Sequence, residues 1–143
     1  MRGAQRRLAS VVALALSAPL VAGGCGGILS PDLFVVQRSG TVPGASVTVL
    51  VNEEGGVHCD GRASGMLSDP ELIEARTIQE ELKGPASKHL SLAPARGSVL
   101  SYRVRSVDGA VSFADNSAGQ PTVLRHLAYL VSRVARALCH RPI

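Results

Sequence analysis

The sequence predicts an α+β domain of two layers, in which four or five antiparallel strands carry two helices on one face. Two pairs of strand-like runs are each joined by a tight glycine-containing turn, and such hairpins pair antiparallel. Two further segments repeat apolar residues at helical spacing. Because each helix must bury one apolar stripe, one sheet face covered by both is the simplest arrangement. The expected order over residues 33–140 is β, β-hairpin, α, β-hairpin, α, in a single domain.

The first half of the domain begins with an expected strand at residues 33–38, an apolar-rich run that Ser39-Gly40 ends. Residues 46–52 alternate, placing Val47, Val49 and Val51 on one face. The sequence Glu-Glu-Gly-Gly at 53–56 predicts a turn, after which residues 57–60 return as the second strand of a hairpin.

The first helix has a clear start. Ser68 or Asp69 can cap it, Pro70 fits its first turn, and Glu71 stands three places after Ser68, as a capping box requires. Apolar residues then recur at helical spacing as far as Leu82. The sequence Lys-Gly-Pro at 83–85 predicts its end, so residues 84–97 are expected to form a loop. This loop is interpreted either as a mobile connector or as a binding loop.

The second half of the domain contains the clearest strand, residues 98–106, in which Leu100, Tyr102 and Val104 face the core. Asp108-Gly109 predicts the hairpin turn, and the return strand runs through Phe113. The last helix is expected to start at 120–121. Its apolar stripe consists of Val123, Leu124, Leu127, Leu130, Val131, Val134 and Leu138.

Residues 1–24 have the pattern of a secretory signal: three arginines, an apolar run at 8–21, and the small residues Ala-Gly-Gly before Cys25. The run is shorter than the roughly 20 residues that a bilayer-spanning helix needs. The segment resembles a bacterial lipoprotein signal. That resemblance implies a lipid on Cys25, a tether over residues 25–32, and an exported protein anchored on the outer side of the cytoplasmic membrane or in the cell envelope. Cleavage by an ordinary signal peptidase is the alternative.

Two further cysteines, Cys59 and Cys139, remain once Cys25 is assigned to lipid. Two remaining cysteines in an oxidising compartment predict a disulfide between them. A zinc or copper site formed by His58, Cys59, Cys139 and His140 is the alternative. In a strand, however, His58 and Cys59 point to opposite faces. We therefore expect the Cys59–Cys139 disulfide, no metal and no cofactor.

The charge balance argues against a nucleic-acid partner. The chain has 15 Lys and Arg against 11 Asp and Glu, but removing residues 1–24 leaves 12 basic against 11 acidic residues. With no Trp and only four other aromatic residues, rings for stacking on bases are few. No GxSxG or HExxH motif is present. The sequence therefore predicts a non-enzymatic binding domain, with the 39–46 and 84–97 loops as its candidate surface and a protein as its partner.

Three features together resemble the emfourin-like domains, small inhibitors of thermolysin-type metalloproteases. They are the run VVQRSG at 35–40, the capped helix, and the stretch SYRVRSVDGAVSFADNSAGQPTVLRHLAYLV at 101–131. The resemblance extends over residues 34–134. It implies protease inhibition as an alternative function, with Arg38, Ser39 and Gly40 in a contact loop.

Overall fold

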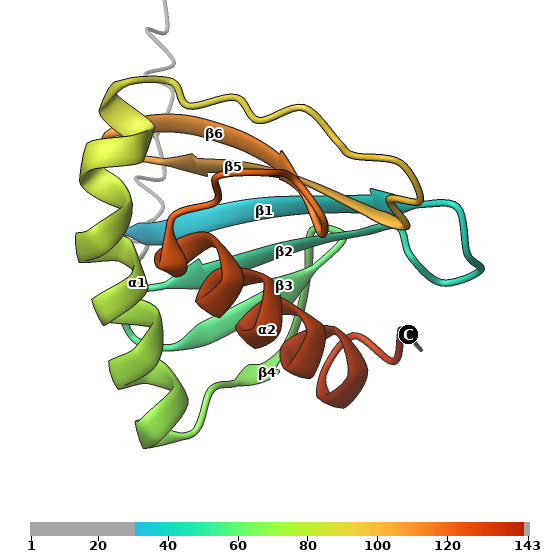
Figure 1. The fold of residues 1–143 in the computed structure, drawn as a ribbon. Coiled ribbons are helices and arrows are strands. Elements are labelled where there is room, and N and C mark those ends of the chain that lie inside the picture. The colour runs from blue at the N-terminus through green and yellow to red at the C-terminus, as the bar shows by residue number, and fades with distance from the viewer. Residues whose placement is uncertain (1–30, 142–143) are drawn as a thin grey trace, which may run out of the picture.

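The computed structural model describes residues 31–141 of the chain. They form one antiparallel sheet of six strands and two helices (Figure 1), which confirms the α+β prediction with six strands in place of four or five. The sheet order is β4-β3-β2-β1-β5-β6. The elements are β1 (Asp32–Gly40), β2 (Val47–Asn52), β3 (Gly56–Cys59), β4 (Arg62–Met66), α1 (Asp69–Ser87), β5 (Leu100–Ser106), β6 (Gly109–Ala114) and α2 (Thr122–Ala137).

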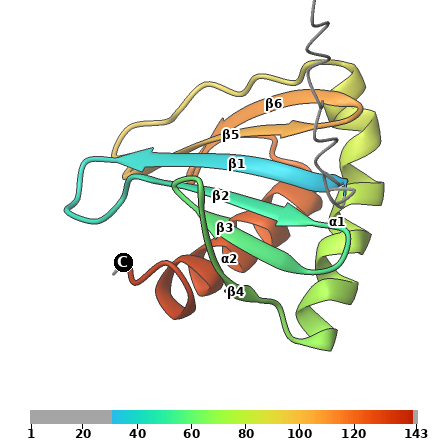
Figure 2. The same cartoon turned by 180° about the vertical axis from the view of Figure 1, so that it is seen from behind.

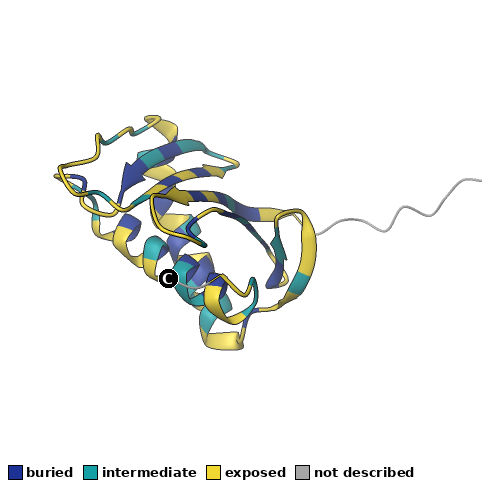
Figure 3. Ribbon diagram, turned by 90° about the vertical axis from the view of Figure 1, so that its right-hand side faces the viewer, coloured by how far each residue is buried: buried dark blue, intermediate teal, exposed yellow. Residues whose placement is uncertain are grey.

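Both helices lie on the same face of the sheet, and within residues 31–141 no helix lies on the opposite face (Figures 1 and 2). Strand alternation separates the two faces. In β1, for example, Phe34 and Val36 are buried toward the helices, whereas Gln37 and Ser39 are exposed on the other side. Buried positions gather between the two layers (Figure 3). The uncovered side is called the open face below.

The strand that the sequence did not reveal is β4. Its sequence, Arg-Ala-Ser-Gly-Met, has no apolar alternation, and four of its five residues are exposed. β4 lies at the sheet edge and pairs only with β3, so it buries little and carries no core pattern. Asp60 and Gly61 form the turn before it, both with positive φ.

Helix α1 begins as predicted but ends later. The backbone N–H and hydroxyl of Ser68 both donate to Glu71 Oε2, at 3.0 and 2.8 Å. The expected stop at 83–85 is wrong, because the helix continues through Pro85 to Ser87. Tertiary packing holds the last turn: Ala86 is buried, and its carbonyl lies so close to Gly109 that a Cβ there would collide with it. The 84–97 loop therefore shortens to residues 88–99.

Helix α2 covers the sheet with a broad apolar stripe. Its buried residues are Val123, Leu124, Leu127, Leu130, Val131, Val134 and Ala135. The stripe matches the predicted one except at its end, where Ala135 is buried and Leu138 lies half-buried against the core. Arg133 pairs with Glu71 and Glu74 of α1, which joins the two helices across their polar edge.

The predicted disulfide is present between Cys59 and Cys139, with Cα atoms 5.6 Å apart. It ties β3 to the chain that follows α2, and an Arg141–Asp60 ion pair of 2.9 Å lies beside it. The predicted signal at 1–24 and the lipidation residue Cys25 lie outside the described residues. Within residues 31–141, no helix is long and apolar enough to cross a membrane.

Candidate functional site

The two candidate loops meet at one end of the sheet, called the distal end below. The backbone N–H of Thr41 donates to the carbonyl of Val99 at 3.1 Å, which joins the 41–46 loop to the 88–99 loop. The chain enters β1 at the other end, the entry end, where Glu53 N–H donates to Pro31 O at 2.9 Å. The nine residues of β1 separate the two ends by about 27 Å.

Arg38, Ser39 and Gly40, the predicted contact residues, lie where β1 reaches the distal end. Ser39 and Gly40 are exposed, but Arg38 is only 2% exposed and faces the helices. Its Nε donates to Ala45 O at 2.8 Å, and one terminal nitrogen donates to Gly44 O at 3.2 Å. Burial lowers the pKa of Arg38, an effect that the neighbouring Tyr102 partly offsets. Arg38 therefore braces the 41–46 loop from inside and presents no surface for direct contact.

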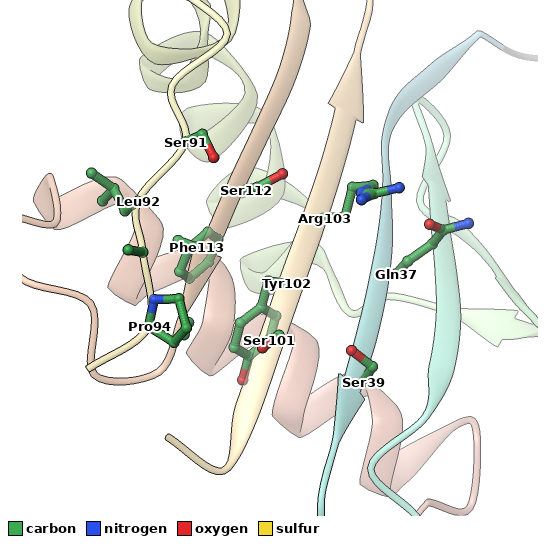
Figure 4. Close-up of a pocket in the computed structure, with 12 residues that line it drawn as sticks. Gln37, Ser39, Ser91, Leu92, Pro94, Ser101, Tyr102, Arg103, Ser112 and Phe113 are labelled. Carbon is green, nitrogen blue, oxygen red and sulfur yellow. The ribbon is translucent and has the colours of Figure 1, made fainter. Parts of the chain in front are cut away.

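A hollow of about 430 Å³ lies on the open face, between the 88–99 loop and the strands β6, β5 and β1 (Figure 4). We call it the open-face pocket. Its polar lining consists of Gln37, Ser39, Ser91, Ser101, Arg103 and Ser112, and Leu92 and Pro94 form its loop side. In Figure 4 the Arg103 side chain extends toward β1, which carries Gln37 and Ser39. The pairing register Gln37–Arg103–Ser112 aligns these three residues across three neighbouring strands.

The loop that walls the pocket is fixed to the sheet. Leu92 N–H donates to Ser112 O at 2.8 Å, and Ser112 N–H donates to Leu90 O at 2.9 Å, so the loop adds a short strand-like pairing to the edge of β6. The Asn116 side chain accepts from Ala95 N–H at 3.0 Å and donates to Arg96 O at 2.9 Å. The pocket wall is thus formed before any ligand arrives, which lowers the ordering cost of binding.

Asp115 fixes the start of β5 beside this loop. Its carboxylate accepts hydrogen bonds from the Ser98 hydroxyl at 2.9 Å and from the backbone of Val99 and Leu100 at 3.1 and 3.2 Å. Burial alone would raise the pKa of Asp115, but these hydrogen bonds outweigh it and lower that pKa. Asp115 is therefore a structural carboxylate that holds the loop junction.

The pocket offers hydrogen-bond donors and one fixed positive charge. The described residues that line it include four serines, one glutamine and one arginine, and none of them is Asp, Glu, His or Cys. No base lies there to activate a serine, and residues 31–141 hold no cluster of three potential metal ligands. Tyr102 and Phe113 also line the hollow, but they are only 4% and 3% exposed and stack on each other 4.8 Å apart. The arrangement fits recognition of an anionic or acceptor-rich ligand.

Sequence reasoning located the 84–97 and 39–46 loops but not the residues between them. The missed residues are Gln37, Ser101, Arg103 and Ser112. Their strand positions alternate with core positions, and in sequence such polar residues look the same as ordinary solvent-facing residues. The available signal was compositional: the outward positions 101, 103 and 105 are serine or arginine, with no acidic residue among them.

Comparisons with known proteins identify no relative. No family model matches the chain, and neither a curated protein nor a solved structure matches it. The resemblance to emfourin-like domains and to lipoprotein signals therefore stays a prediction from the sequence.

Proposed function

We propose that this chain is an exported, lipid-anchored protein of the cell envelope whose single domain binds a protein partner without catalysing a reaction. The observation that carries the proposal is the open-face pocket, which has a fixed wall and a donor-rich lining but no nucleophile–base pair. Such a site is built for recognition.

The direction of the chain supports the anchored arrangement. A lipid on Cys25 would lie only six residues before Pro31, and β1 starts immediately afterwards at the entry end. The 41–46 and 88–99 loops lie at the distal end, about 27 Å further along β1. A tether of this length would hold the entry end near the membrane and point the distal loops away from it.

Two measurements test the proposal. The intact mass of protein extracted from membranes should show a lipid on the N-terminal Cys25 and the loss of two hydrogens for the Cys59–Cys139 bond. A photo-crosslinking amino acid at Ser39 or Ser112 should form a discrete protein adduct in cells. The same residue at Thr77, exposed on α1, serves as the control and should form none. An unlipidated Cys25, or no adduct at either pocket position, would refute the corresponding half of the proposal.

A narrower candidate, inhibition of a thermolysin-type protease, draws support from the 41–46 loop. Exposed loops held by a rigid scaffold suit binding to a protease cleft, and Arg38 holds this loop through Gly44 and Ala45. The purified chain should then slow such a protease, and both Ser39→Arg and Arg38→Ala should weaken inhibition, while Thr77→Ala should not. Absence of inhibition across several thermolysin-type proteases would remove this candidate and leave the broader proposal standing.

A further inference from the structure

We propose that the open face binds an extended acidic peptide in which two carboxylates, two residues apart, pair with Arg103 and Arg105. This inference rests on the proposed role as a binding domain and names the chemistry of the partner. It does not depend on the lipid at Cys25.

The two arginines form a matched pair on one strand. Arg103 and Arg105 are alternate residues of β5, both exposed, and their side chains leave the same face of the sheet. Their Cα atoms are therefore about 6.6 Å apart, the spacing of alternate residues in any extended peptide. A strand-like ligand lying along β5 would present its first and third side chains to the two guanidinium groups in turn.

Neither arginine has a counter-ion in the part of the chain that the structure describes. The ion pairs found there use Lys83, Arg133 and Arg141. The strand neighbours of Arg103 are Gln37 and Ser112, and those of Arg105 are Val35 and Ala110, so no neighbour in register is acidic. Two adjacent unpaired cations repel each other, and two carboxylates would relieve that repulsion.

Each arginine also lines a separate hollow. Arg103 lines the open-face pocket, and Arg105 lines a second hollow of about 520 Å³ toward the entry end, together with Val35, Ser106 and Val107. Among the described residues, Asp32 is the only carboxylate that lines this second hollow, and no ion pair joins it to Arg105. The two hollows lie at either end of the arginine pair along β1 and β5, which gives a ligand longer than a single anion room to lie along the strands.

The lining argues against single-stranded nucleic acid as the anionic ligand. Single-stranded nucleic acids need exposed rings on which bases stack, and the nearest rings, Tyr102 and Phe113, are buried and stacked on each other. A guanidinium group can bind a carboxylate through two parallel hydrogen bonds, and the pocket serines can donate hydrogen bonds to a peptide backbone or accept them from it. An extended acidic peptide fits both the charge and the hydrogen-bonding groups.

The test uses the full chain purified in detergent and a peptide labelled at its N-terminus, fluorescein-Ser-Glu-Val-Glu-Ser-amide, followed by fluorescence anisotropy; the acetylated peptide of the same sequence is the unlabelled competitor. Arg103→Gln and Arg105→Gln should each weaken binding about 3- to 5-fold, which is the upper part of the range for an exposed ion pair, and the double variant about 10- to 25-fold. Arg125→Gln makes the same charge change on the exposed surface of α2 and should stay within 2-fold of the unaltered chain. Two control peptides test the spacing: one with adjacent glutamates and one with both replaced by glutamine should bind at least 5-fold more weakly.

Four results would overturn the inference: no saturable binding of the peptide, equal weakening by Arg125→Gln, equal affinity for the two glutamate spacings, or competition by inorganic phosphate as strong as that of the unlabelled peptide. The last would indicate a general anion site. If photo-crosslinking at Ser39 or Ser112 still captures a protein while the peptide fails to bind, the binding role survives and only the acidic-peptide assignment falls.

Discussion

The disulfide between Cys59 and Cys139 closes a loop of 80 residues, which spans most of the domain. Replacing both cysteines by alanine removes this constraint from the unfolded chain. The chain-entropy relation for a loop of this length gives about 4.5 kcal/mol of stabilisation, and measured values often fall to about 2 kcal/mol. The double variant should therefore unfold with a free energy about 2 to 4.5 kcal/mol lower than the oxidised chain.

The native fold should survive the substitution, because α2 does not depend on the bond for its packing. Seven of its residues are buried against the core, and Arg133 still joins it to α1. For the 111 described residues, an unfolding entropy of about 2.1 cal/mol/K per residue converts the loss into a Tm lower by roughly 9 to 19 °C.

The assay compares two full chains that both carry Cys25→Ser, one with Cys59 and Cys139 and one with alanine at both positions. Urea unfolding followed by circular dichroism gives the free energies, and calorimetry gives Tm. Arg141→Ala is the control, since it removes only the exposed ion pair to Asp60 and should cost less than about 1 kcal/mol. A loss below 1 kcal/mol for the double cysteine variant would refute the loop-closure reasoning.

Three further predictions concern the distal loops and the carboxylates. Arg38→Ala should destabilise the domain by about 2 to 4 kcal/mol, because the hydrogen bonds from Arg38 to the carbonyls of Gly44 and Ala45 are lost. The 41–46 loop should then loosen, and the Ala45 amide, which donates to Val42 O, should exchange faster; unchanged exchange at Ala45 would contradict the bracing role. Asn116→Ala should free the 88–99 loop at a cost of about 1 to 2 kcal/mol, seen as faster exchange of the Ala95 amide, whereas equal protection would show that other contacts hold the loop. The folded-state pKa of Asp115 is lowered, so its contribution is complete above its unfolded pKa of about 3.9 and is lost as pH falls through the folded value. The free energy of unfolding of Asp115→Asn should therefore fall less below about pH 4 than that of the unaltered chain. Urea titrations at several pH values that show the same fall for both chains would rule this out.

The alternation of apolar and polar residues, together with the turn-forming residues, was enough to predict most of the fold. The valines of β2 and the Tyr102 and Val104 positions of β5 are buried as expected, because each strand has one face on the core. The Ser68–Glu71 capping box also formed as the sequence indicated, since a cap depends on local residues only.

The predictions failed where contacts between residues far apart in the sequence override the local secondary-structure preference. Gly84 and Pro85 are poor helix residues, yet α1 continues past them because Ala86 packs on β6, a contact the local sequence does not encode. β4 was missed because an edge strand needs no apolar pattern. The open-face pocket was missed for a related reason: its residues come from three strands and a loop, and only the sheet register brings Gln37, Arg103 and Ser112 together.

The position of β1 has a mechanical consequence. β1 is the first strand after the N-terminal segment, lies in the middle of the sheet, and pairs antiparallel with β2 on one side and β5 on the other. A pull on the chain at Pro31 acts along the axis of β1, while its inter-strand hydrogen bonds run across that axis. Both ladders are thus loaded in shear and must fail together, rather than opening one bond at a time. A domain tethered at this end and held at the far end of β5 would transmit the load through a strand that is hydrogen-bonded on both sides.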